Sequence, residues 1–470
     1  MDLEYEKMKK IEKAVPKSAR GFSTSLYTYM LEAWRRGITV KVYNLYYKEK
    51  RGIRLQLTHN NKTHNFQFSL GDKVTRDVTK VTKLKHTTKE LLAKADVPVP
   101  KGLSFTKDHS IKEIVANSEE IDYPLVAKPT DASVGRGVCV NLKNKEELKG
   151  ALKYIKEELG YHNIIVEQMV SGDDTRMLVV DGEVISVYRR VPVSVKGNGK
   201  DTIEQLIINK NKVRKKHPHA LKNMIEINEE LQLFIDKKGY SLNSIPLRDE
   251  KVYLSDSTLH ALAAEVEDIT DKVSEKAKNV AVKAAQVMNI SEHCGIDVMV
   301  DHEKDTAHVL EINSRPNLGG CMFPIYGKGR DVPKAIIDLY FPETKNINIT
   351  DKLDVFIDYD QIVEMLNSGV VDEVILKKIS KQSLSKYVWI SGTIKAVPFK
   401  KWIKNQAVKY NLFGQVSVKE NEAEIIIYGN EQDVQKFLDK IKSHQFKRTN
   451  IEDIKVTEHV GRIYSGFRIK

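Results

Sequence analysis

Three oxygen-bearing side chains, those of Asp297, Glu311 and Asn313, have the types and spacing of a metal site. They lie in or beside two apolar runs, 296–300 and 309–312, which are expected to form paired strands around a charged turn. Positions 311 and 313 differ by two and therefore face the same side of a strand. Their oxygens are expected to converge with those of Asp297.

A site built from oxygen ligands, without a nearby His or Cys, suits Mg²⁺. This ion usually keeps several waters and shares its other positions with nucleotide phosphates, so the expected ligand is Mg-ATP. In the alternative interpretation, Glu311 and Asn313 are solvent-facing residues of an edge hairpin, as most acidic strand residues are. The remaining motifs bear on this choice.

A second group of residues has the composition of a phosphate-binding loop. Lys128 ends an apolar strand, and a loop of small residues with Ser133, Gly135 and Gly137 follows it. Glycine lets backbone N–H groups approach a phosphate, and the lysine adds positive charge. The loop has neither the Walker A pattern nor Gly-x-Gly-x-x-Gly. In isolation it is equally consistent with a flexible hairpin.

Two further segments could complete a nucleotide site. Lys89 lies in the first turn of a helix expected from Thr87, where a cation is unfavourable unless it reaches solvent or meets an anion. A strand expected over 164–167 leads into a segment whose backbone groups can pair with an adenine. Asp174, farther along, can accept hydrogen bonds from ribose hydroxyl groups.

Arginines near these motifs are candidates for binding a carboxylate or an acyl phosphate, because a guanidinium can donate two parallel hydrogen bonds. The candidates are Arg176, Arg189, Arg190 and Arg315. Alternation along a strand places Arg189 and Arg190 on opposite faces, so only one of them should face the site, and we take it to be Arg189. Each arginine could instead form a surface salt bridge.

The N-terminal segment, residues 1–85, is expected to form a small α/β domain. Its helix should start at Ser23 or Thr24 as N-cap and end at Gly37. The Ser-Thr-Ser turn could also bind an anion through exposed amides. Strands are expected over 38–45, 53–57 and 65–70.

Composition limits the class of protein. The 470 residues predict two to four domains, and 41% hydrophobic with 30% charged residues is typical of a globular protein. No apolar run approaches the roughly 20 residues of a membrane helix, and no signal-peptide core is visible. We therefore expect a cytoplasmic protein without a membrane partner. The three cysteines are expected to be reduced and mostly buried, with Cys321 as an alternative nucleophile.

The formal net charge of +12 favours anionic substrates. Nucleic acid is not favoured as a partner, because the lysines are spread along the chain and no nucleic-acid motif appears. The segment 209–219 is densely basic. It could recruit an acidic peptide or amino acid, or form a solvated helical face.

In this order, the motifs resemble the ATP-grasp superfamily over about residues 87–342, with particular similarity to cyanophycin synthetase and the bifunctional glutathione synthetases. The phrases that carry the similarity include 176–182, 188–192 and 239–246. The resemblance implies an α+β fold in which two α+β subdomains, within residues 86–342, clasp ATP. It also implies that Asp297, Glu311 and Asn313 hold Mg²⁺. The residues implied to contact the nucleotide are Lys89, Lys128, Ser133, Gly135, Gly137, Glu167, Gln168, Met169, Val170 and Asp174.

The activity implied by the resemblance is that of a carboxylate-amine ligase. The carboxylate of a small molecule or peptide attacks ATP, an amine attacks the resulting acyl phosphate, and an amide, ADP and phosphate are released. Arg176, Arg189 and Arg315 are the candidates for binding the acyl phosphate. Relatives also suggest a homo-oligomer. Two alternatives stay open: a regulatory ATP-binding module without ligase activity, and a small-molecule kinase on the same fold.

The last segment, residues 388–470, resembles an acylphosphatase domain, which implies a ferredoxin-like α/β sandwich. The family's arginine position reads Lys400, its asparagine position reads Val418, and Pro398 replaces a loop glycine. These departures favour a binding or assembly module over a hydrolase. Residues 343–387 are expected to be a short connector between this domain and the ATP-grasp region.

Overall fold

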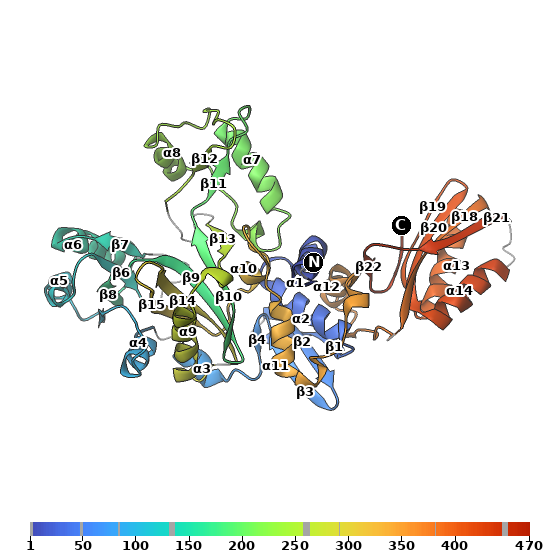
Figure 1. The fold of residues 1–470 in the computed structure, drawn as a ribbon, viewed down its shortest axis with the longest axis horizontal. Helices are drawn as coiled ribbons and strands as arrows, with labels where there is room; N and C mark the ends of the chain where they lie inside the picture. Colours follow the sequence, from blue (N-terminus) through green and yellow to red (C-terminus); the bar gives the residue numbers. More distant parts are fainter. Residues whose placement is uncertain are drawn as a thin grey trace.

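The computed structural model describes residues 3–47, 50–82, 85–130, 137–256, 264–290, 292–380, 382–443 and 450–470. Figure 1 shows the N-terminal elements in the middle of the molecule, two further sheets and an upper lobe on one side, and the C-terminal sheet on the other. Within the described part of the chain, no helix has the length and apolar character needed to cross a membrane.

Helix α2 (Thr24–Arg35) is the centre of the N-terminal part, and every one of its residues is buried. It ends before Gly37, which has a positive φ of 80°, as the sequence predicted. Ser23 occupies the N-cap, which confirms the predicted position, but its side chain forms no capping hydrogen bond. The Thr24 hydroxyl donates instead to the carbonyl of Ala19 at 2.9 Å. Helix α1 (Leu3–Ala14) precedes it.

The first sheet has the order β17-β1-β2-β3-β4. Four of its strands come from the N-terminus: β1 (Thr39–Tyr47), β2 (Lys50–His59), β3 (Lys62–Gln67) and β4 (Leu70–Gly71). The fifth, β17 (Glu373–Ile375), runs antiparallel to β1, with Lys41 opposite Ile375. Part of the segment expected to be a connector therefore completes the N-terminal sheet.

Other parts of residues 343–387 pack against α2. Strand β16 (Val355–Phe356) accepts two hydrogen bonds from the buried guanidinium of Arg35 through the carbonyl of Val355. Helix α12 (Tyr359–Asn367) contributes to the same apolar core. This segment and the N-terminal elements thus share one core, although they lie more than 300 positions apart.

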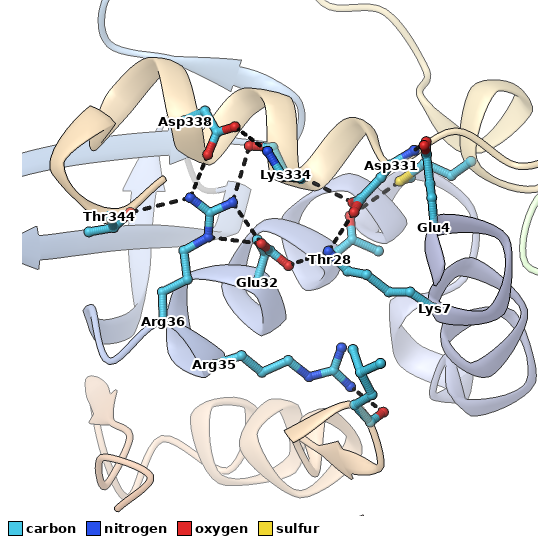
Figure 2. A network of polar contacts seen from close by, with 12 residues as sticks. Glu4, Lys7, Thr28, Glu32, Arg35, Arg36, Asp331, Lys334, Asp338 and Thr344 are labelled. Atoms are coloured by element: carbon cyan, nitrogen blue, oxygen red, sulfur yellow. Dashed lines mark hydrogen bonds and ion pairs between the residues drawn. The ribbon is translucent and has the colours of Figure 1, made fainter. Parts of the chain in front are cut away.

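A buried network of charges joins α1 and α2 to α11 (Val332–Tyr340), as Figure 2 shows. The ammonium of Lys7 lies 2.7 Å from Glu32 and 2.6 Å from Asp331, and Arg36 pairs with Glu32 and, at 2.6 Å, with Asp338. Most of these side chains are almost fully buried. Because isolated buried charges are costly, the network fixes the three helices relative to one another.

The small sheet of the predicted ATP-grasp region has the order β5-β8-β6-β7. Helices α5 (Ile111–Asn117) and α6 (Lys145–Lys153) pack together, and both contribute to one apolar core with the sheet. The strands are β5 (Gly102–Phe105), β6 (Leu125–Pro129), β7 (Cys139–Leu142) and β8 (Ile164–Gln168). Helices α3 (Arg76–Val81) and α4 (Lys85–Lys94) come before it in the chain.

The central sheet has the order β13-β10-β9-β14-β15. Its strands are β9 (Asp173–Val180), β10 (Glu183–Val191), β13 (Glu265–Asp268), β14 (His293–Asp301) and β15 (Thr306–Asn313). Helix α9 (Glu275–Val287) covers one face, where Ala281 and Ala284 share a core with Ile296 and Val298. The predicted pairing of 296–300 with 309–312 is confirmed by the antiparallel ladder of β14 and β15.

The insertion between β10 and β13 forms a lobe with its own apolar core, drawn above the central sheet in Figure 1. Its basic segment is not simply a solvated face, because Arg214 is 2% exposed and donates to Glu265 at 3.0 Å. Lys210 pairs with the same carboxylate at 2.9 Å. The lobe contains β11 (Ser194–Lys196), α7 (Ile203–Arg214), α8 (Glu229–Asp236) and β12 (Lys251–Tyr253).

The C-terminal domain is a five-stranded sheet of order β21-β18-β20-β19-β23 whose core includes residues of two helices, as expected for a ferredoxin-like sandwich. A short strand, β22 (Ile463–Tyr464), pairs with β16 and docks the domain on the N-terminal part. Pro398 lies in the first turn of α13, where proline is tolerated. The remaining elements are β18 (Ser383–Thr393), α13 (Ala396–Lys409), β19 (Phe413–Lys419), β20 (Glu422–Asn430), α14 (Glu431–Ser443), β21 (Asn450–Glu458) and β23 (Phe467–Ile469).

Candidate functional site

The three residues expected to bind a metal share one face of the central sheet. Asp297 of β14 lies directly opposite Glu311 of β15, and Asn313 lies opposite Gly295. A register shift follows Asp297 in this ladder. The alternate residues of these two strands, such as Ile296 and Ile312, lie on the face that α9 covers. The oxygens of all three predicted ligands are therefore directed to the face away from α9.

Two arginines reach this face from neighbouring strands. Arg176 of β9 is the cross-strand neighbour of Asp297, and its Nε and Nη2 donate to both carboxylate oxygens, the Nη2 bond being 2.7 Å long. Arg190 of β10 donates through Nη2 to Asp297 at 3.2 Å and through Nη1 to Asp174 at 2.5 Å. Two carboxylates and two guanidinium groups thus form one connected cluster.

Charge neutralisation dominates the electrostatics of this cluster. Burial favours the neutral form of Asp297, but Arg176 and Arg190 hold the pKa of its carboxyl below the usual value. Asp174 differs, because burial outweighs Arg190 and raises its pKa. Although burial disfavours the charge of Arg176, Asp297 and, more weakly, Glu311 raise its pKa well above the usual value. Glu311 is therefore close enough to act on the cluster.

Gly295 allows this close packing. A Cβ at this position would lie 2.7 Å from the Cβ of Pro316 and 3.0 Å from the Cδ of Arg176, both too short for ordinary contact. The absence of a side chain therefore lets Arg176 lie across β14 toward Asp297.

The expectation that Arg189 rather than Arg190 faces the site is wrong. Arg189 lies opposite Thr175 on the face that α9 covers, and it pairs with Asp173 at 2.9 Å and Glu267 at 2.8 Å. Strand alternation then directs Arg190 to the other face, beside Asp297.

Arg315 is not brought into the cluster either. It is exposed, and together with burial it lowers the pKa of Arg54 on β2, so it lies toward the N-terminal sheet. Within the described residues it forms no ion pair with Asp297 or Glu311.

The two lysines expected to contact a nucleotide meet on one carboxylate. Lys89 of α4 donates to Oε2 of Glu167, and Lys128 of β6 donates to Oε1. Although burial opposes ionisation of Glu167, the two lysines hold the pKa of its carboxyl below the usual value. Burial and the neighbouring Lys128 lower the pKa of Lys89 to about 8. The two lysine charges thus lie side by side at Glu167 of the small sheet.

A cavity of about 850 Å³ opens between α4 and the β5–β8 edge of the small sheet. Lys89 and Glu167 are part of its wall. A second cavity, of about 580 Å³, lies at the ends of β9 and β10, and Asp174 and Arg190 line it together with Asp173 and Arg189. Both volumes lie in the range of small-molecule sites.

We call the segment expected to pair with an adenine, residues 167–170, the hinge. Two of its backbone N–H groups already form hydrogen bonds within the protein. The N–H of Gln168 donates to the carbonyl of Lys101 at 2.8 Å, and the N–H of Met169 donates to that of Pro124 at 2.9 Å. A base bound here must therefore use other groups of the hinge, such as those of Val170.

The predicted phosphate loop is described only at its end. Ser133 and Gly135 lie outside the described residues. Gly137 lies within them, with a positive φ of 73°.

Among the described residues, no three His, Cys, Asp or Glu side chains are grouped as a metal site. The predicted set contains two carboxylates and one amide, Asn313, so it is not a group of that kind. Its donors are all oxygens on one sheet face, which fits Mg²⁺.

The alternative nucleophile Cys321 does not fit that role. It lies in the short helix α10 (Gly319–Met322), is 2% exposed, and burial raises the pKa of its thiol to about 11. A thiol in this state is inert.

Comparison with known proteins assigns the part of the site that carries Arg176 and Arg190. Residues 82–200 match the model of the RimK-like ATP-grasp domain, and residues 386–469 match that of acylphosphatase. The chain carries an ATP-grasp domain. The predicted resemblance and the ATP-grasp fold with an acylphosphatase-like C-terminal domain are thereby confirmed.

Named relatives and a solved structure extend this match. The chain is 29% identical over 315 residues to the glutathione biosynthesis bifunctional protein GshAB of Clostridium perfringens, covering 62% of this chain and 40% of that protein. It is 29% identical over 316 residues to the cyanophycin synthetase of Trichormus variabilis, covering 63% and 34%. The bifunctional glutathione synthetase of Pasteurella multocida superposes with a TM-score of 0.50 at 24% identity, covering 64% of this chain and 41% of that one.

The matched regions are thus well under half of the length of these relatives. The match therefore assigns no substrate or activity of the whole relatives to this chain.

Proposed function

We propose that this protein is an ATP- and Mg²⁺-dependent carboxylate-amine ligase that forms a peptide or isopeptide bond. The observation that carries the proposal is the shared face of the central sheet, on which Asp297 and Glu311 lie beside Arg176 and Arg190. The proposal is supported by the match of residues 82–200, which include Arg176 and Arg190, to an ATP-grasp domain, and by the similarity of the chain to GshAB and to cyanophycin synthetase.

Asp297, Glu311 and Asn313 are the residues that would hold Mg²⁺, which when bound supplies positive charge beside the nucleotide phosphates. Both ammonium groups of Lys89 and Lys128 already converge on one anionic group, the carboxylate of Glu167. When the nucleotide binds, its phosphates replace Glu167 as the partner of the two lysines. The loop with Ser133, Gly135 and Gly137 covers the phosphates. The hinge 167–170 and Asp174 hold the adenosine.

Arg176 and Arg190 bind the reacting carboxylate and the developing acyl phosphate with their planar forks. A carboxylate oxygen attacks the γ-phosphorus, the bond from phosphorus to the bridging oxygen breaks, and ADP leaves. A neutral amine then attacks the acyl carbon, the carbon–oxygen bond breaks, phosphate leaves, and the amine loses a proton. Phosphoryl transfer of this kind depends mainly on positioning and charge stabilisation.

The net charge of +12 and the arginines favour an acidic amino acid or peptide as carboxylate donor. We further propose a cytoplasmic homo-oligomer in which the C-terminal acylphosphatase-like domain is a non-catalytic module. Lys400, at the family's arginine position, donates to the carbonyl of Lys470 at 3.1 Å, which supports its loss of the anion-binding role.

The test is ADP release from Mg-ATP with a panel of amino acids, singly and in pairs, with mass spectrometry of the products. We expect one pair to stimulate ADP release and to give a condensed product, with Glu311→Gln reducing both strongly. A phosphorylated product without condensation would identify a kinase instead. Tight Mg-ATP binding without turnover on any member of the panel would favour a regulatory module.

A further inference from the structure

Both oxygens of the Asp297 carboxylate accept hydrogen bonds from guanidinium groups. Its Oδ1 accepts from Nε of Arg176 and from Nη2 of Arg190, and its Oδ2 accepts from Nη2 of Arg176. The side chains of Asp297, Arg176 and Arg190 are only 13%, 12% and 9% exposed. Water therefore screens these contacts weakly.

Charge counting shows the consequence for a metal ion. The face carries three carboxylates, those of Asp174, Asp297 and Glu311, and the two guanidinium groups of Arg176 and Arg190. Asp174 and Asp297 are both paired with these guanidinium groups, so a cation that used Asp297 would have to approach two positive groups at close range. Mg²⁺ also gives up its waters reluctantly and needs accessible carboxylate oxygens.

We propose that Arg176 and Arg190 are resident counter-ions of Asp297, which keep a divalent metal out of the site until it arrives together with a nucleotide. This inference rests on the proposed function of the same site. Arg190 links the two aspartates, because it pairs with Asp174 and Asp297 at once.

A nucleotide provides hydrogen-bond acceptors for the two arginines, which a free metal ion does not. Its phosphate oxygens can accept the paired N–H groups of both arginines, as carboxylates do. The two guanidinium groups then turn from Asp297 to the phosphates, and Asp297 becomes available as a ligand. Metal and nucleotide binding are therefore strongly coupled, and the coupling is reciprocal.

The test measures Mn²⁺ binding to the full chain by electron paramagnetic resonance, with and without a non-hydrolysable ATP analogue. In the wild type we expect weak Mn²⁺ binding alone and at least about tenfold tighter binding with the analogue. Arg190→Gln should tighten Mn²⁺ binding without nucleotide by about tenfold, because one positive charge leaves the site. The matched control is Arg189→Gln, one residue away on the opposite face, which should change neither affinity.

Two further measurements keep the test decisive if Arg190→Gln folds poorly. Arg190→Met removes the charge without introducing an unpaired amide, and Arg190→Lys keeps the charge and should keep Mn²⁺ binding weak. Mn²⁺ binding in the wild type that is as tight without nucleotide as in Arg190→Gln or Arg190→Met would overturn the inference, while leaving the ligase proposal intact. Absence of any nucleotide-dependent Mn²⁺ binding would overturn both.

Discussion

Arg176 and Asp297 are direct cross-strand neighbours on β9 and β14, and the guanidinium donates to both oxygens of the carboxylate. Cross-strand pairs on one sheet face are the shortest route by which two strands can place opposite charges in contact. The pair joins a residue expected to bind metal to one expected to bind phosphate. Any ligand of this face must therefore compete with it.

Replacing Asp297 by Asn should cost stability as well as activity. The change leaves Arg176 and Arg190 without their shared buried carboxylate, so we expect the free energy of unfolding to fall by about 3 kcal/mol. Denaturant unfolding would measure it. Asp173→Asn is the matched control, because its partially exposed pair with Arg189 on the other face should be worth less than about 1 kcal/mol. Equal losses of unfolding free energy in the two variants would contradict the conclusion that the Asp297 cluster is more deeply buried than the pair of Asp173 and Arg189.

Nucleotide binding should weaken in alkaline solution. The pKa of Lys89 is lowered to about 8 in the free protein. Below that pH the ammonium is already formed, so affinity should be independent of pH. Above it, binding of phosphate must take up a proton, so the Kd for Mg-ATP should rise by about tenfold per pH unit. Calorimetric titration between pH 7 and 10 tests this.

Lys89→Arg is the control for the alkaline effect, since a guanidinium stays protonated across that range. Its affinity should not fall between pH 8 and 10. A wild-type affinity that is flat over the whole range would mean that the charge of Lys89 does not contribute to binding.

Glu32 should be more important for stability than its distance from the site suggests. It accepts from both Lys7 and Arg36 in the network of Figure 2, and its side chain is 3% exposed. Glu32→Gln leaves two buried cations under-neutralised, so unfolding should require about 3 kcal/mol less. Lys10→Gln removes the exposed pair with Asp354 and should change stability by less than about 1 kcal/mol. A Glu32→Gln variant as stable as Lys10→Gln would show that the network is dispensable.

A methyl group at Gly295 should disturb the site without unfolding the protein. Its Cβ would press on Arg176 and Pro316, so Gly295→Ala is expected to cost about 1–3 kcal/mol and to lower ADP release strongly. Gly150→Ala in α6 is the control, because nothing lies within 4 Å of its added carbon and alanine favours a helix. If Gly295→Ala releases ADP at the wild-type rate, the position of Arg176 does not matter for the reaction.

The hairpin that carries the candidate metal ligands was predictable because its signals are local. Two apolar runs flank a charged turn, and the spacing of Glu311 and Asn313 gives their shared face from the strand period alone. The convergence of Lys89 and Lys128 on Glu167 was only half predictable. Sequence motifs located the lysines, but the pairing of β6 with β8, which brings Lys128 beside Glu167, is a tertiary feature.

The choice between Arg189 and Arg190 could not be made from the sequence. Alternation separates the two side chains but does not tell which face a helix will cover, and β10 also has a register shift between Val184 and Ser186. Likewise, the sequence does not show how deeply the helix that ends before Gly37 is buried. Its burial on all sides depends on distant segments, such as α11 and α12, that pack around it.

The central claim is that a carboxylate is activated by direct transfer of the γ-phosphoryl group of ATP. The decisive measurement uses the condensing pair of substrates with the donor carboxylate labelled in its oxygens with a heavy isotope, and follows the label by mass spectrometry. We expect one labelled oxygen in each released phosphate, because the acyl carbon–oxygen bond breaks when the amine attacks. Phosphate without label, released in step with the amide, would contradict an acyl-phosphate intermediate and with it the proposed ligase mechanism.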